Sequence, residues 1–266
     1  SDVYKRQIYD SCKDIRLAAT GSASPIIEDA STDSGTGRWT VIKIPTLSFY
    51  EYCQLLQLDD MPLLPDHLKI TDIPKMENAE VADLMARFEP LVKHFNRYLT
   101  IGGFPELALS DDDLYAQRML REDVVDKVIK RDVLTLFKVR SPLLMEKLFL
   151  YLCMNSTEIF SATTAAKELD NISPNTIESY VDALVKSNLI YMAYPIAVGS
   201  KSVLKGRPKI YIADAAIRNA VLMVDDVLSD ERELGLLIET TIYKHLVSFY
   251  HCLLYTSDAA DDLIGV

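Results

Sequence analysis

The sequence has 266 residues, of which 49% are hydrophobic, and its formal net charge is −11. This composition is typical of a globular chain long enough for two or three small domains, and the acidic charge excludes a general nucleic-acid binder, leaving room only for a local basic face. The cysteines are scattered without CxxC spacing, which favours buried thiols over a disulfide framework or a zinc site. No apolar run could span a bilayer and no signal peptide is present, so we expect a cytoplasmic protein without membrane contact.

The two ends of the chain share an unusual property. Residues 1–7 (SDVYKRQ) and 252–257 (CLLYTS) can be encoded by a single inverted nucleotide repeat, which unrelated peptides would not share. The repeat matches the mosaic-end adapter of transposon-based sequencing libraries. We therefore interpret residues 1–7 and 252–266 as adapter translation and leave them out of the expectations for the fold. A natural disordered tail is the alternative interpretation.

Two strands and a helix start are predicted near the N-terminus. Residues 15–20 (IRLAAT) are a short apolar run typical of a buried parallel strand. A polar loop at residues 28–37 separates them from a second strand at residues 39–44 (WTVIKI), which is rich in β-branched residues. Ser48 can cap a helix that starts at the next residue, because Glu51 follows it at the spacing of a capping box.

The middle of the sequence changes to a helical pattern. Apolar residues from 77 to 99 recur at helical spacing, and Pro90 predicts a kink or a break within them. The Gly102-Gly103 pair predicts a helix end with freedom for positive φ, and Pro105 can start the next element. A long amphipathic stretch follows at residues 114–139.

Three helices and two strands are predicted next, in the order of a winged helix. The helices are expected at 142–154, 161–169 and from Pro174 onward, and the strands at 188–195 and 209–213. Residues 214–224 open a further unit, and residues 233–250 are a final amphipathic helix.

The third helix of this order carries a mixed set of polar residues: Asn175, Thr176, Glu178, Ser179, Asp182 and Lys186. A recognition helix brings several basic residues to phosphates, so a single lysine beside two acids favours a role in packing. A basic patch beside the wing keeps DNA binding open as an alternative: Lys201, Lys205, Arg207 and Lys209.

Five segments in order resemble a known family: LAATGSAS, GRWTVIKIPTLSFYEY, YLTIGGFPE, KIYIADAAIRNAV and ELGLLIETTIYKHL. Together they are similar to the AAA+ P-loop ATPases that carry a C-terminal nuclease-like domain, the archaeal-ATPase-like family. Each motif is weak by itself, but the five occur in the order of that family and cover nearly all of residues 8–250.

The resemblance implies a mainly α fold with an α/β remnant. Its parts would be a C-terminal remnant of the AAA+ ATPase core (8–57), a helical lid (58–140), a winged-helix domain (141–213) and the start of a nuclease-like α/β domain (214–251). In the family's sheet order, five-one-four-three-two, this chain holds strands four and five only. Because strand one is missing, we expect residues 8–52 to be poorly ordered or to pair non-natively.

The resemblance also implies site residues. Thr20 or Ser22 would be the sensor that orients the attacking water, and Arg38 would be an arginine finger, acting across a homo-oligomer interface. Glu239 would be the first acidic position of the nuclease-like domain. The alternatives are a turn hydroxyl for Thr20 and Ser22, a surface charge for Arg38 and a solvated helix face for Glu239, the last of which we favour.

The functional expectation follows from what the chain has and lacks. No GxxxxGK[ST] phosphate loop is present in the sequence. We therefore expect the intact parent to bind ATP and Mg²⁺ and to act as a switch or motor on an unknown protein partner, and this chain by itself to bind neither well and to be inactive. A winged-helix DNA-binding regulator is the alternative.

Overall fold

The protein is described from a computed structural model, which covers residues 44–58, 61–62, 68, 70–134, 137, 139–195, 206–224 and 226–254. The strand expected at residues 15–20 and nearly all of the strand expected at 39–44 lie outside these residues. The described part is mainly helical, as the sequence predicts. None of its helices combines the length and the hydrophobicity that a membrane crossing requires.

The first part of the described chain consists of short helices: α3 (Phe49–Leu55), η1 (Ile70–Lys75), α4 (Asn78–Phe88), η2 (Glu89–Leu91), α5 (Val92–Ile101), α6 (Pro105–Ala108), α7 (Asp113–Arg121) and the π-helical η3 (Glu122–Val133). The expected capping box is confirmed, since the Glu51 N–H donates to Ser48 Oγ over 3.3 Å and the Ser48 N–H donates to the Glu51 carboxylate over 2.7 Å. Pro90 lies in the short η2 turn that divides α4 from α5, which confirms the expected break.

The second part contains α9 (Pro142–Met154), α10 (Ala162–Glu168), α11 (Pro174–Lys186), β1 (Ile190–Ala193), β2 (Lys209–Ile212), α12 (Ala215–Leu222) and α13 (Glu231–Leu254). The starts expected at Pro142 and Pro174 are confirmed, because proline has no N–H to lose at a first helical position. The π-helical geometry of η3 is not foreseen by the sequence pattern.

The sheet is small, and its two outer edges differ. β1 and β2 are antiparallel, with Ile190 opposite Ile212 and Met192 opposite Ile210. The other edge of β2 is taken by the turn after α9: the Thr157 N–H donates to the Ile210 carbonyl over 2.7 Å, and the Ile210 N–H donates to the Glu158 carbonyl over 3.1 Å. β2 is therefore the middle strand of this arrangement, and β1 is an edge strand among the described residues.

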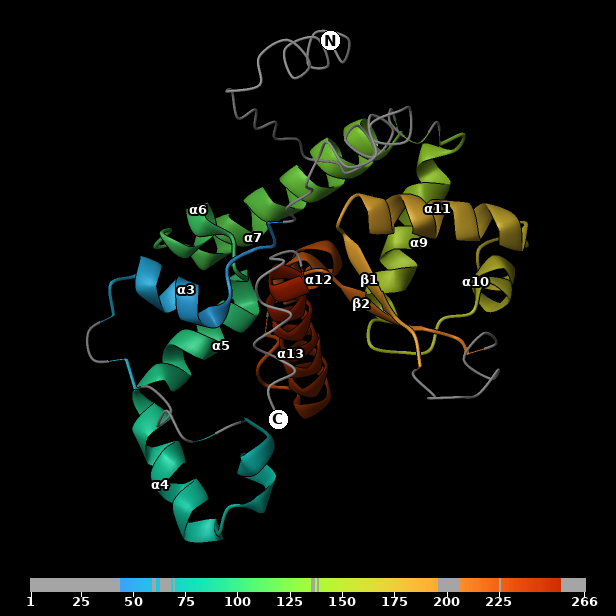
Figure 1. The fold of residues 1–266 in the computed structure, drawn as a ribbon. Helices are drawn as coiled ribbons and strands as arrows, with labels where there is room; N and C mark the ends of the chain where they lie inside the picture. The colour runs from blue at the N-terminus through green and yellow to red at the C-terminus, as the bar shows by residue number, and fades with distance from the viewer. Residues whose placement is uncertain are drawn as a thin grey trace, which may run out of the picture.

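One cluster of buried apolar residues joins both parts, running from Tyr52 on α3 to Val221 on α12. Helix α13 lies between α5 and the β1–β2 sheet and contacts both (Figure 1). Cys53 and Cys153 are buried free thiols whose pKa is raised by burial, which confirms their interpretation as core residues.

The expectation of poor order is wrong for residues 44–52. Helix α3 packs on α5 and α6, and Tyr52 is fully buried. The contacts of α3 with α5 and α6 hold this helix in place.

Candidate functional site

The expected site residues fall into two groups. Thr20, Ser22 and Arg38 lie outside the described residues, so their roles stay predictions. Glu239 lies on α13 and is described below. The described residue set instead contains a buried polar centre that sequence reasoning missed, built from the same motifs that carry the family resemblance.

The centre of this site is an ion pair between Asp214 and Lys244, whose side chains are only 2% and 3% exposed. Lys244 Nζ donates to Asp214 Oδ2 over 2.7 Å, to the Tyr98 hydroxyl over 2.8 Å and to the Leu47 carbonyl over 2.9 Å. The ammonium also lies 5.0 Å from the centre of the Tyr98 ring. All three donors of the lysine are therefore satisfied inside the protein.

Asp214 is the N-cap of α12 and is the best connected group of the site. Its carboxylate accepts from the Thr46 hydroxyl over 2.7 Å, from the Gly103 N–H over 3.2 Å and from the Ala216 N–H over 3.0 Å. Burial alone would raise the pKa of Asp214, but the charge and hydrogen bond of Lys244, with these donors, outweigh it and hold the pKa below its usual value. The aspartate is therefore ionised in the folded protein.

The Gly102-Gly103 pair allows the chain segments to approach this closely. Gly102 ends α5 with φ of +74°, which confirms the positive φ expected for the pair. A side chain on Gly103 would put a Cβ 2.1 Å from the Leu47 carbonyl oxygen and 2.8 Å from Lys244 Nζ. Gly102 thus serves the helix end, whereas Gly103 is required by packing, which sequence reasoning did not foresee.

His245 fastens α3 to α13 beside the ion pair. Its Nε2 accepts from the Phe49 N–H over 2.8 Å, and its Nδ1 lies 2.7 Å from the Thr241 carbonyl. Burial lowers the pKa of His245, and the nearby Lys244 charge lowers it further. The neutral ring, with the proton on Nδ1, satisfies both contacts, so this histidine has a packing role.

We call the set Thr46, Leu47, Tyr98, Gly103, Asp214 and Lys244 the junction cluster. It ties together residues 46–47, the end of α5, the start of α12 and the middle of α13. Its charges are paired and its donors are used, and the side chains of Tyr98, Asp214 and Lys244 are buried, whereas Thr46 and Leu47 are half-buried. The junction cluster therefore has a structural role: its hydrogen bonds and its ion pair hold together segments that are distant in the sequence.

Glu239 lies on the same helix as Lys244 but at the sheet. Its carboxylate accepts from Lys209 Nζ over 3.0 Å and from the Tyr211 hydroxyl over 2.8 Å. Tyr211 stacks on Tyr243 with ring centres 3.9 Å apart. Burial alone would raise the pKa of Glu239, but Lys209 and Tyr211 outweigh it and lower the pKa. Glu239 thus joins α13 to β2, and its nuclease role stays a prediction.

We assign no site for ATP or Mg²⁺ among the described residues. The sequence has no phosphate loop, and among the residues that the structure describes no group of three or more His, Cys, Asp and Glu side chains is arranged to hold a metal ion. A hollow of about 540 Å³ beside Glu239 contains Arg218 and Glu233, but these are paired to each other over 2.6 Å.

The outer face of α11 is acidic on balance. Asn175, Glu178, Ser179, Asp182 and Lys186 are exposed on it. Asp182 and Lys186 form an ion pair over 2.9 Å within the helix. Of the patch beside the wing, Lys201 and Lys205 lie outside the described residues, Arg207 is exposed and Lys209 is paired with Glu239.

Comparison with known proteins places the chain in a family whose function is not known. The fold is that of a mainly helical protein with a small antiparallel sheet. The chain belongs to the family described as "Domain of unknown function (DUF8612)", which matches residues 92–228. That region holds Tyr98, Gly103 and Asp214 of the junction cluster.

The chain is also similar to curated proteins that are themselves uncharacterized. It is 23% identical to a protein of Haemophilus influenzae over 206 residues, which is 76% of this chain and 44% of the relative. It is 24% and 26% identical to two proteins of Methanocaldococcus jannaschii, over 92% and 93% of this chain and 49% and 51% of those relatives. The chain thus spans about half the length of these relatives. No solved structure matches it significantly.

Proposed function

We propose that this chain is part of an ATP-binding AAA+ protein and that its described residues couple the nucleotide-binding core to the C-terminal unit. The junction cluster carries the proposal. It holds residues 46–47, which follow directly on the strand expected after Arg38, to Lys244 of α13 and to Asp214 of α12. A displacement of Arg38 during ATP hydrolysis would be passed to α12 and α13 through these few bonds.

The way in which the motifs meet supports the same proposal. The segments IPTLSF, IGGFPE, ADAAIRN and ETTIYKHL are far apart in the sequence, yet each supplies a member of the junction cluster or a residue bonded to it. Four of the five resembling segments are thus joined at one place. In a protein in which ATP turnover moves the core relative to its appended domains, such a set of bonds would transmit the motion from one to the other.

The first test is to look for a phosphate-loop motif in the gene sequence upstream of the codons for this chain, and to assay a full-length relative. We expect a GxxxxGK[ST] motif after a strand in the part of the M. jannaschii relatives that this chain does not cover. Such a relative, purified whole, should hydrolyse ATP in the presence of Mg²⁺, and replacing its counterpart of Arg38 should lower the rate about a thousandfold or more. This chain alone should show no turnover. Absence of the motif and of turnover in the relatives would overturn the proposal.

A DNA-binding regulator is the second candidate, and one observation favours it. The segment at residues 157–160, β2 and β1 lie side by side in that order, α9 and α11 contact these strands and α10 packs on α11, which supports a winged-helix arrangement. Against it, the exposed face of α11 carries Glu178 and Asp182, which repel phosphates.

The two candidates differ in a shift assay on the full chain. The acidic face of α11 predicts that the chain does not bind DNA. A DNA-binding protein would bind, and its affinity would fall steeply as the salt concentration rises. Arg207→Ala is the matched variant, because Arg207 is the exposed basic residue beside the wing. Salt-dependent binding that this variant weakens would favour the regulator.

A further inference from the structure

We propose that the groove between α11, β1 and α13 binds a small organic cation with an apolar or aromatic body. The inference goes beyond the proposed function, since neither the groove nor its ligand depends on ATP binding. It rests on the volume of the groove, on the aromatic rings that line it and on the carboxylates along its α11 wall.

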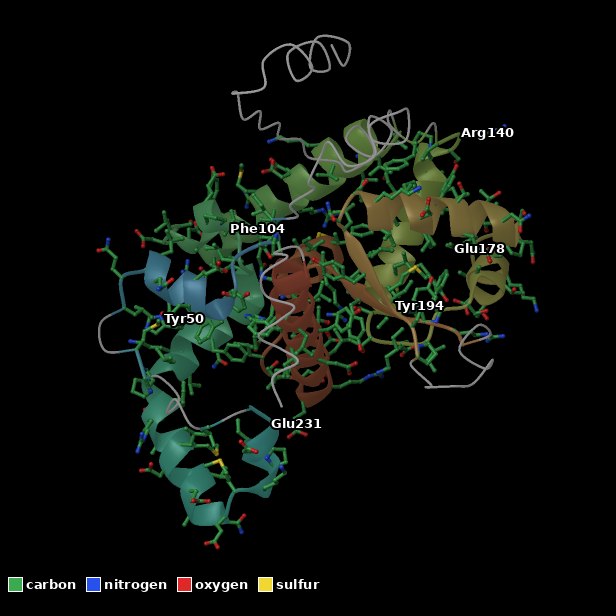
Figure 2. The ribbon with its side chains drawn as sticks, viewed as in Figure 1. Tyr50, Phe104, Arg140, Glu178, Tyr194 and Glu231 are labelled. Carbon is green, nitrogen blue, oxygen red and sulfur yellow. The ribbon has the colours of Figure 1, made fainter. Side chains whose placement is uncertain are left out.

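The groove has the size of a small-molecule site. Its volume is about 880 Å³, and ligand pockets occupy roughly 300–1,000 Å³. Its walls are held in place by the fold, because α11 contacts β1, and α13 contacts β2, the partner of β1. Figure 2 labels three residues that line it, Phe104, Glu178 and Tyr194, which come from the turn after α5, from α11 and from the end of β1.

One wall of the groove is a single face of α11. Four residues of this helix line the groove, at the three- and four-residue spacing of neighbours on one helix face: Glu178, Val181, Asp182 and Val185. Val181 is buried and Val185 is half-buried, whereas the two carboxylates are exposed. A ligand that packs its apolar body against the valines therefore has both carboxylates beside it.

The charges of the groove favour a cation. Asp182 is paired with Lys186 over 2.9 Å, but both side chains are largely exposed, and exposed pairs of this kind attract each other only weakly. Arg207, from the turn before β2, is the one basic residue among the described residues that line the groove. Two carboxylates thus face one guanidinium, and the chain as a whole is acidic, so the potential in the groove attracts positive charge.

Aromatic rings give the groove a second attraction for a cation. Tyr191 and Tyr243 both line it, with ring centres 6.2 Å apart and ring planes tilted by 57°. One face of Tyr243 is stacked on Tyr211 at 3.9 Å, which holds the ring in place. The face of an aromatic ring attracts an ammonium group, and it also packs against apolar surface. Rings and carboxylates together therefore match a ligand that combines an apolar body with an amine.

The test uses dansylcadaverine, which joins a naphthalene ring to a primary amine through an apolar chain and fluoresces more strongly, at shorter wavelength, in apolar surroundings. Added to the full chain, it should show this change and should saturate. Its N-acetyl derivative has the same body without the charge and should bind about tenfold more weakly. Dansylaminohexanoic acid, which carries a carboxylate instead, should bind more weakly still.

Three variants locate the site. Glu178→Gln should weaken the binding of dansylcadaverine several-fold and leave that of the N-acetyl derivative unchanged, because only the amine interacts with the lost charge. Glu168→Gln is the matched control, since Glu168 is an exposed carboxylate of α10 and is not among the residues that line the groove. Val185→Trp, which fills the groove from the α11 wall, should abolish the binding of both compounds while circular dichroism shows the helices retained.

Absence of binding, or equal affinity for the three dansyl compounds, would overturn the inference. An equal loss in Glu178→Gln and Glu168→Gln would also overturn it, because the attraction would then come from the net charge of the chain and not from the groove. These comparisons decide the matter even if Val185→Trp does not fold. None of the measurements involves nucleotide, so a failure here leaves the ATP-binding proposal untouched.

Discussion

Lys244 shows how much a single buried charge can determine in this fold. Its ammonium group is enclosed, and its hydrogen bonds reach Asp214 and Tyr98 and the backbone of residue 47. Removing one partner of a buried pair leaves the other charge uncompensated, which costs more than the pair itself contributes. We therefore expect that removing Lys244 would cost more free energy of unfolding than its ion pair with Asp214 contributes, because the Asp214 charge would remain buried without a partner.

Lys244→Met should destabilise the chain by about 3–5 kcal/mol, since Asp214 stays buried and loses its counter-charge. The free energy of unfolding in urea measures this. Lys186→Met is the matched control, because its ion pair with Asp182 is exposed on α11 and should contribute no more than about 1 kcal/mol. Combining Lys244→Met with Asp214→Asn should restore part of the loss. Equal effects of the two lysine variants would contradict the role given to the junction cluster.

His245 should make the stability depend on pH. Its pKa in the folded protein is lowered, so its contribution is fully present above the unfolded pKa of about 6.5 and is lost as the pH falls toward the folded value. Unfolding in urea at pH 7.5 and at pH 5.5 should show lower stability at the acidic pH, and His245→Gln should reduce this difference. His94→Gln is the comparison: burial also lowers the pKa of His94, but at this partly exposed position the substitution should reduce the difference less. An unchanged pH dependence in His245→Gln would show that the ring does not titrate as inferred.

At the level of elements, the junction depends on the backbone approach at the end of α5. Gly103 lies against the Leu47 carbonyl and Lys244, whereas Gly235 in α13 has open space where a side chain would be. The two glycines therefore respond in opposite ways to the same substitution.

Gly103→Ala should destabilise the protein by more than about 2 kcal/mol, because the backbone of residue 47 must shift and the bonds of Lys244 with it. Gly235→Ala should stabilise α13 by up to about 1 kcal/mol through helix propensity. Thermal unfolding of both variants measures the difference. A harmless Gly103→Ala would mean that residues 46–47 are not held as closely as described.

The helices could be predicted well where their signals are local. Pro142, Pro174 and the Ser48 capping box mark helix starts within a few residues, and each is confirmed. The junction cluster could not be predicted this way, because Thr46, Gly103 and Lys244 meet only after the chain has folded. In the sequence Lys244 is one more polar position in an amphipathic helix, with nothing nearby to show that it is buried.

On the scale of the whole molecule, the regions expected to be a lid and a winged helix share one hydrophobic core. The buried cluster includes Tyr52 of α3, Leu152 of α9 and Ile217 of α12. Helix α13 contacts both α5 and β2 (Figure 1). Segments assigned by resemblance to different domains therefore bury their apolar surface against one another.

This continuity predicts one cooperative unfolding transition for the described residues. Far-ultraviolet circular dichroism, which follows the helices, and near-ultraviolet circular dichroism, which follows the tyrosines, should give coincident curves on heating. Two separate transitions would show that the parts fold independently despite their shared core.

The enclosure of Lys244 also has a consequence for chemical modification. An acylating reagent has to reach the side-chain nitrogen of a lysine, and Lys244 Nζ is enclosed by its bonds to Leu47, Tyr98 and Asp214. Surface lysines of the chain can be acylated while the fold is intact, but Lys244 becomes reactive only when residues 46–47 move away. The rate at which Lys244 is acylated, measured by mass spectrometry, would therefore report how often residues 46–47 separate from Lys244.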